Sequence, residues 1–134
     1  MKTRNSILSL AGIASLASIV LLFVMTVFAA DLNGKWKAEF DTQVGVQKYT
    51  FTFKVEGEKL TGKASFERME QKGEAELLEG KVSGTNVSFV EKLSFDGNDI
   101  RLEYNGKING DEISFTRKVG DFATEQFVAK RVKE

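Results

Sequence analysis

Apolar and polar residues alternate along most of the chain from residue 34 to residue 132, which is the period-two pattern of half-buried β-strands. In the first such segment Trp36, Ala38 and Phe40 alternate with charged residues. No segment beyond residue 30 shows a helical period long enough to predict a helix. We predict eight strands, at about 34–41, 48–55, 60–66, 75–82, 87–95, 100–108, 113–119 and 124–132.

The predicted strands are joined by short segments that contain glycine together with Asn, Asp, Ser or Glu, at 56–57, 83–84, 96–97, 109–110 and 120–121. Such residues tolerate the positive φ of tight hairpin turns, so successive strands are predicted to be antiparallel neighbours. A longer loop is predicted at 68–73. Eight strands in this order predict an all-β fold, a closed up-and-down antiparallel barrel in which no sheet edge is left unpaired.

An internal repeat predicts how the strands are aligned. Residues 80–89 match residues 106–115, with five of ten positions identical. A large ring placed opposite a glycine fills a layer of the core and shields a weak strand position. The repeat and the hairpin at 55–60 predict three such pairs across neighbouring strands, namely Gly80–Phe89, Gly106–Phe115 and Phe53–Gly62.

Residues 1–30 differ from the rest of the chain. Lys2 and Arg4 precede an apolar run over 7–28, and small residues at 29–30 come before the polar Asp31. This is the layout of a secretory signal peptide, so we expect 1–30 to be a signal helix and 31–134 to be one β-barrel domain, secreted or periplasmic. The apolar run is also long enough for an uncleaved membrane anchor, which is the alternative and the only membrane contact we expect.

The residues that are missing limit the chemistry. The chain has no histidine, no cysteine and no proline, so it lacks the commonest general base, a thiol nucleophile and a disulfide framework. After residue 30 there are 17 basic and 19 acidic residues, which gives a formal charge of −2 and argues against nucleic acid as a partner. We expect no enzyme activity, no catalytic residue, no metal and no cofactor.

One polar group is predicted inside the barrel. The Gly–Phe alignment, extended across the hairpin at 95–100, places Glu91, Tyr104 and Arg117 in one row on three adjacent strands, on the same face as the buried aromatics. An ionisable residue on an apolar face is costly unless it is paired or hydrated. The row is either the polar end of a ligand site, with Tyr49 as a further candidate, or a solvated rim or self-satisfied internal pair.

The segment Gly34-Lys35-Trp36, on the first strand of an eight-stranded meander, resembles the Gly-x-Trp of the calycin superfamily. That superfamily includes lipocalins, fatty-acid-binding proteins and avidins. The resemblance implies a barrel that binds a small hydrophobic or amphipathic ligand. By similarity to fatty-acid-binding proteins, Arg117 and Tyr104 would hold a ligand carboxylate.

We therefore expect a secreted binding protein that holds a small hydrophobic or amphipathic ligand or docks a protein partner. The alternative is an inhibitor or accessory protein that acts through its outer surface while side chains fill the barrel. The sequence does not determine the oligomeric state.

Overall fold

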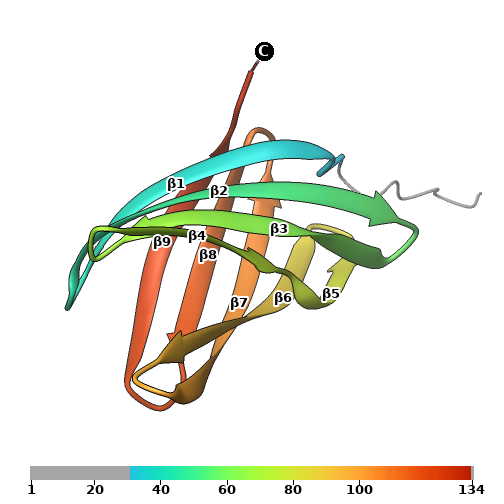
Figure 1. The fold of residues 1–134 in the computed structure, drawn as a ribbon. Helices are drawn as coiled ribbons and strands as arrows, with labels where there is room; N and C mark the ends of the chain where they lie inside the picture. The colour runs from blue at the N-terminus through green and yellow to red at the C-terminus, as the bar shows by residue number, and fades with distance from the viewer. Residues whose placement is uncertain (1–30, 134) are drawn as a thin grey trace, which may run out of the picture.

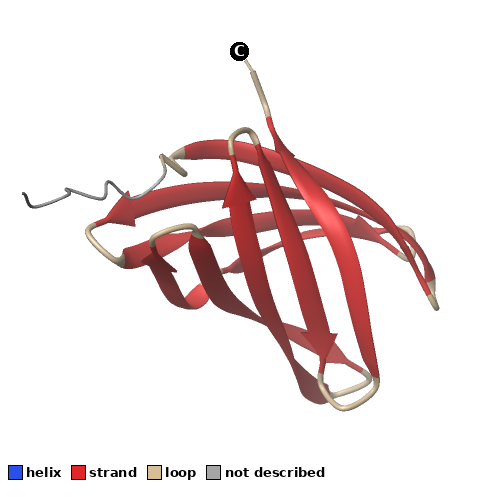
Figure 2. Cartoon of the chain, turned by 180° about the vertical axis from the view of Figure 1, so that it is seen from behind, coloured by secondary structure: helices blue, strands red, loops and turns tan. Residues whose placement is uncertain are grey.

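The computed structural model describes residues 31–133, which form nine antiparallel strands joined by short turns (Figures 1 and 2). The predicted signal helix over 1–30 lies outside the described residues. Within them, no helix is long and apolar enough to cross a membrane. The strands are β1 (Gly34–Thr42), β2 (Gly45–Glu56), β3 (Lys59–Arg68), β4 (Gln71–Glu76), β5 (Leu78–Ser83), β6 (Asn86–Phe95), β7 (Asn98–Asn109), β8 (Glu112–Val119) and β9 (Ala123–Arg131).

The sheet closes on itself, because β1 pairs with β2 on one side and with β9 on the other, and β2 also pairs with β3. Strands β4 and β5 both pair with β3 and together take one position, so the closed barrel has the eight antiparallel positions that the alternation predicts. Figure 1 shows β1, β2 and β3 crossing β7, β8 and β9 at a steep angle. The described residues therefore form one closed barrel around a single core.

The predicted fourth strand is divided at Leu77 into β4 and β5, and a bulge follows at the start of β5. The pairing with β6 shifts by one residue between Leu78 and Lys81, and Glu79 has a positive φ of 52°. An extra residue in one strand bends it and increases its twist. Among residues 31–133, β4 pairs with β3 but not with β6, and the end of β6 beyond Val90 pairs with β7 alone.

Two of the three predicted glycine–phenylalanine pairs are confirmed, Phe53–Gly62 and Gly106–Phe115. A methyl group at Gly106 would lie 2.6 Å from a ring carbon of Phe115, so the ring occupies the space of the missing side chain. The third predicted pair, Gly80–Phe89, falls at the bulge, where the pairing of β5 with β6 is interrupted between Leu78 and Lys81.

The predicted loop at 68–73 is also wrong. Met69 and Glu70 alone form a two-residue turn, with φ of 49° and 62°, and β4 begins at Gln71. These values suit the type I′ turn that matches strand twist, although neither residue is a glycine. The sequence signal for this turn is therefore weak, and the closer pairing adds Arg68 to the end of β3.

Aromatic rings fill the interior of the barrel. Phe89 stacks on Tyr104 with ring centres 4.5 Å apart, and Phe40 stacks on Phe127 at 4.1 Å. Offset and edge-on ring contacts of this kind add to the free energy gained by burying apolar area. Other fully buried side chains in this core include Trp36, Phe51, Leu60, Leu102 and Ile113.

One end of the barrel is closed by Trp36, which is completely buried. Its indole nitrogen donates a hydrogen bond to the backbone oxygen of Leu32 at 3.0 Å. The guanidinium carbon of Arg131 lies 4.4 Å from the centre of the Trp36 ring. The segment before β1 therefore covers this end, and the other end carries the polar side chains.

Candidate functional site

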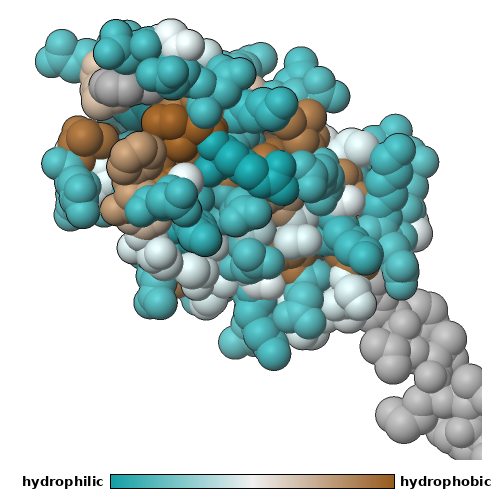
Figure 3. All heavy atoms as spheres, turned by 90° about the horizontal axis from the view of Figure 1, so that it is seen from below, coloured by the Kyte–Doolittle hydropathy of each residue, from teal (hydrophilic) through white to brown (hydrophobic). Residues whose placement is uncertain are grey.

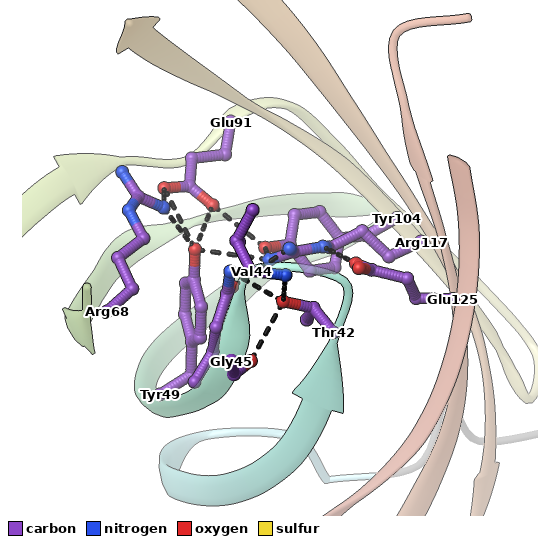
Figure 4. Close-up of polar contacts among 10 residues, drawn as sticks. Thr42, Val44, Gly45, Tyr49, Arg68, Glu91, Tyr104, Arg117 and Glu125 are labelled. Atoms are coloured by element: carbon purple, nitrogen blue, oxygen red, sulfur yellow. Dashed lines mark hydrogen bonds and ion pairs between the residues drawn. The ribbon is translucent and has the colours of Figure 1, made fainter. Parts of the chain in front are cut away.

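The four candidate residues from the sequence meet in a buried cluster at the other end of the barrel (Figure 4). Tyr104 lies directly opposite Arg117 on the neighbouring strand, as predicted. Glu91 is not in that row: Phe89 lies opposite Tyr104, and Glu91 lies opposite Leu102. The predicted alignment of β6 with β7 is therefore wrong by two residues.

The cause is the hairpin between β6 and β7. The prediction placed four residues in this turn, but Asp96 and Gly97 alone form it, with φ of 53° and 80°, and Phe95 pairs with Asn98. A shift of two residues keeps every side chain on the same face of a sheet, whereas a shift of one would reverse the faces. Glu91 therefore still points into the barrel and reaches Tyr104.

Glu91 is the centre of the cluster and is completely buried. The hydroxyl of Tyr104 donates to its Oε1 at 2.8 Å, and the hydroxyl of Tyr49 donates to the same oxygen at 3.2 Å. Arg68 forms an ion pair with Oε2 at 3.3 Å. A buried carboxylate needs such partners, because an unpaired charge in this position would strongly oppose folding.

Both tyrosines are held in the protonated form that this arrangement requires. Burial raises the pKa of Tyr49, and the negative charge of Glu91 raises it further. The same two causes, in the same order, raise the pKa of Tyr104 well above its usual value. Each hydroxyl therefore donates to Glu91 and accepts from Arg117, whose Nη1 lies 3.2 Å from Tyr49 and 3.1 Å from Tyr104.

Arg117 is bound on all three of its nitrogens. Besides the tyrosine contacts of Nη1, its Nε donates to Glu125 at 2.8 Å and its Nη2 donates to Gln47 at 2.9 Å. The Arg117 side chain is almost completely buried, and that of Glu125 is largely buried. Arg117 is thus fully occupied by the protein itself, which supports the self-satisfied interpretation for this one residue.

Three members of the cluster were missed by the sequence analysis: Gln47, Arg68 and Glu125. Gln47 lies two residues from the buried Tyr49, so the alternation would have placed it inside had the strand predicted at 48–55 been extended. Glu125 lies within the strand predicted at 124–132, two residues from the buried Phe127, so the alternation already places it on the inner face. Arg68 has the same relation to Phe66 but was assigned to a loop.

The polar cluster has no net formal charge. It contains two arginines, Arg68 and Arg117, and two glutamates, Glu91 and Glu125, joined by two ion pairs. Low polarity around buried ion pairs makes removal of either partner costly, although the complete pair contributes little net stability. Packing alone therefore gives no reason for the barrel to carry this cluster.

A cavity of about 270 Å³ lies over the cluster in the mouth of the barrel. Arg68, Arg117, Gln47 and Glu125 all border it. Its other walls come from the four hairpins at this end and are largely apolar, with Val44, Met69, Leu93, Ile100, Val119, Phe122 and Ala123. Figure 3 shows apolar side chains gathered next to strongly hydrophilic ones on the face seen from below.

This arrangement can hold a small molecule with one polar end and one apolar end. Ligand sites in proteins are mostly apolar cavities with a few placed polar groups that orient the ligand. Within residues 31–133 there is no group of three or more carboxylates that could hold a metal ion. No family model, no curated protein and no solved structure matches the chain. The function must therefore be inferred from the site itself.

Proposed function

We propose that this chain is a binding protein that holds a small amphipathic ligand in the mouth of its barrel. The observation that carries the proposal is the position of the buried polar cluster, which lies directly under an apolar cavity at the open end. An apolar ligand body would contact the walls, and its polar end would meet the cluster. Ligand cavities are usually about 300 Å³ or larger, so a cavity of about 270 Å³ fits a small ligand or one end of a longer one.

Binding is favoured over catalysis because both carboxylates of the site are occupied by arginines and the chain has no histidine or cysteine. We also propose that the chain is a calycin-like barrel. Its closed meander of eight strand positions and the Trp36 that fills one end support this. We further propose that the protein is secreted or periplasmic, because the apolar segment at 7–28 has the layout of a signal peptide.

Native mass spectrometry of the protein purified from its host tests this function. We expect a retained small molecule that is released on denaturation. A Leu93→Glu variant, which places a charge in the cavity wall, should release it, whereas Val128→Glu, on the outer face of β9, should not. Absence of any retained molecule, together with failure to bind small amphipathic probes, would contradict the proposal.

A second candidate is a protein that acts through its outer surface. Two observations favour it: aromatic side chains fill the deep interior, and a groove of about 960 Å³ crosses β9, β1, β2, β3 and β4. The exposed side chains of this groove carry charges of both signs, with Lys37, Glu39, Lys48, Glu67, Lys72, Glu74 and Lys130. If Lys48→Glu abolishes the biological effect of the protein while Leu93→Glu preserves it, this candidate replaces the first.

A further inference from the structure

The four arginines of the described chain differ in how completely they are bound. Arg101, Arg117 and Arg131 each donate hydrogen bonds from all three guanidinium nitrogens, Nε, Nη1 and Nη2. Two of them, Arg101 and Arg131, lie at the surface, where water could have replaced any missing partner. Arg68 is buried, and it is the arginine with the fewest partners.

Only Nη1 of Arg68 is bound within residues 31–133, by the hydroxyl of Tyr49 and by Glu91. The guanidinium carbon lies 3.6 Å from the centre of the Phe66 ring, so that ring covers one face of the group. Nε and Nη2 have no acceptor in the same range, although the side chain is only 7% exposed. In Figure 4, Tyr49 and Glu91 both lie on one side of the Arg68 guanidinium, and its other nitrogens lie away from them.

Buried N–H donors of a charged group are normally satisfied, because leaving them without an acceptor costs more free energy than a normal hydrogen bond contributes. Nε and Nη2 form one edge of a planar fork whose spacing matches the two oxygens of a carboxylate. Since Arg68 also borders the mouth cavity, the missing acceptor is expected from whatever fills that cavity.

We infer that the ligand of the mouth cavity carries a carboxylate, and that Arg68 binds it through Nε and Nη2. This inference rests on the proposed function and assigns the chemical class of its ligand. It also replaces Arg117, the residue implied by the family resemblance, because every nitrogen of Arg117 already has an acceptor. Tyr104 likewise donates to Glu91 and is not free to donate to a ligand.

The walls of the cavity define the rest of the ligand. Leu93, Ile100 and Phe122 lie on the hairpins β6–β7 and β8–β9 and offer apolar contacts to a short chain or ring. Exposed carboxylates lie in the turns of the same hairpins, at Asp96 and Asp121, and beside one turn at Asp99 on β7. Charges in water are strongly screened. The three exposed aspartates therefore repel an anionic ligand less than direct contact with Arg68 attracts it.

Three probes of one shape test the inference: 3-phenylpropionate, 3-phenylpropanol and 3-phenylpropylamine, each titrated into the purified protein by calorimetry. We expect the acid to bind at least about tenfold more tightly than the alcohol, and the amine to bind most weakly. Arg68→Gln should remove the advantage of the acid over the alcohol. Arg101→Gln, a matched change at a surface arginine outside the cavity, should preserve it.

A second measurement needs no variant, so it holds even if Arg68→Gln fails to fold. In the ¹⁵N spectrum of the wild-type protein, 3-phenylpropionate should shift the Nε resonance of Arg68 and leave that of Arg131 in place. If acid and alcohol bind equally, or the amine binds best, the carboxylate inference is wrong while the proposed function stands. If none of the three probes binds, both are overturned for ligands of this size.

Discussion

The two ends of the barrel differ in what occupies the opening between the strands. At the closed end, Trp36 fills the opening, and the segment before β1 covers it. Arg131 lies over this ring and donates to Asp111 and to the backbone oxygens of Asn33 and Asp31. Every charged group there is either bound or exposed to water, so stability alone explains the arrangement.

At the mouth, an arginine also lies over an aromatic ring, but it is less completely bound than the arginine at the closed end. Arg68 covers Phe66 and has two nitrogens without an acceptor within residues 31–133. Glu91 is buried with it, and a cavity takes the place that Trp36 fills at the closed end. A costly polar group that packing does not require is the usual mark of a site kept for function rather than stability.

The largest loss of stability is expected at the closed end. Trp36→Ala should lower the free energy of unfolding by about 3–5 kcal/mol, because it leaves a cavity in a well-packed core and removes the hydrogen bond to Leu32. Urea unfolding monitored by circular dichroism measures this. If the variant is as stable as the wild type, Trp36 does not seal this end in the way described.

At the mouth, Glu91→Gln should lower the free energy of unfolding by about 3 kcal/mol, because the buried Arg68 loses the carboxylate that neutralises it. Glu79→Gln is the matched control, since Glu79 also pairs with an arginine but both side chains are exposed. The control should unfold at nearly the same urea concentration as the wild type. Equal losses for the two variants would show that the mouth cluster is not effectively buried.

Alkaline pH should weaken the mouth before the closed end. The pKa values of Tyr49 and Tyr104 are raised by burial and by Glu91, so the unfolded chain releases these protons first. The stability that depends on them is complete below about pH 10, the usual tyrosine value, and falls as the pH rises above it. In urea unfolding at pH 8 to 11, the double variant Tyr49→Phe, Tyr104→Phe should start less stable but lose less stability with pH.

The smallest effect on stability is expected at the rim. Phe122 is 77% exposed, so Phe122→Ser should change the free energy of unfolding by no more than about 0.5 kcal/mol. Because its ring borders the cavity, the same change should weaken binding of 3-phenylpropionate. Calorimetry and urea unfolding on one preparation separate the two effects. Unchanged affinity would show that the ligand does not reach this wall.

The errors of the sequence analysis share a physical cause. Alternation assigns side chains to faces but says nothing about how far one strand slides along the next, which depends on the turn. The turns at 69–70 and 96–97 use two residues each, fewer than the loops predicted there, and the bulge near Glu79 has no marker in the alternation. The prediction for Glu91 is therefore correct in the face of the sheet but wrong by two residues in the alignment of β6 with β7.

The candidate site was predicted in part for the same reason. The alternation predicts Glu91, Tyr49, Tyr104 and Arg117 as polar residues on an apolar face, and all four are buried together. Arg68 was missed because its strand was ended two residues too early. Which arginine retains unbound nitrogens depends on contacts between strands far apart in sequence, such as Tyr49 with Glu91, 42 residues away.

By itself, the sequence determined the all-β class, the eight barrel positions, the buried faces and the absence of histidine and cysteine chemistry, because strand period and composition are local properties. The tertiary structure decided the slide between strands, the break between β4 and β5, and the convergence of polar side chains from several strands under one cavity. Those depend on long-range pairing and on how each buried donor finds its acceptor, which no single segment specifies. The sequence-based prediction and the tertiary structure differ most at Arg68, because the sequence predicts a loop there and the structure has a buried cation.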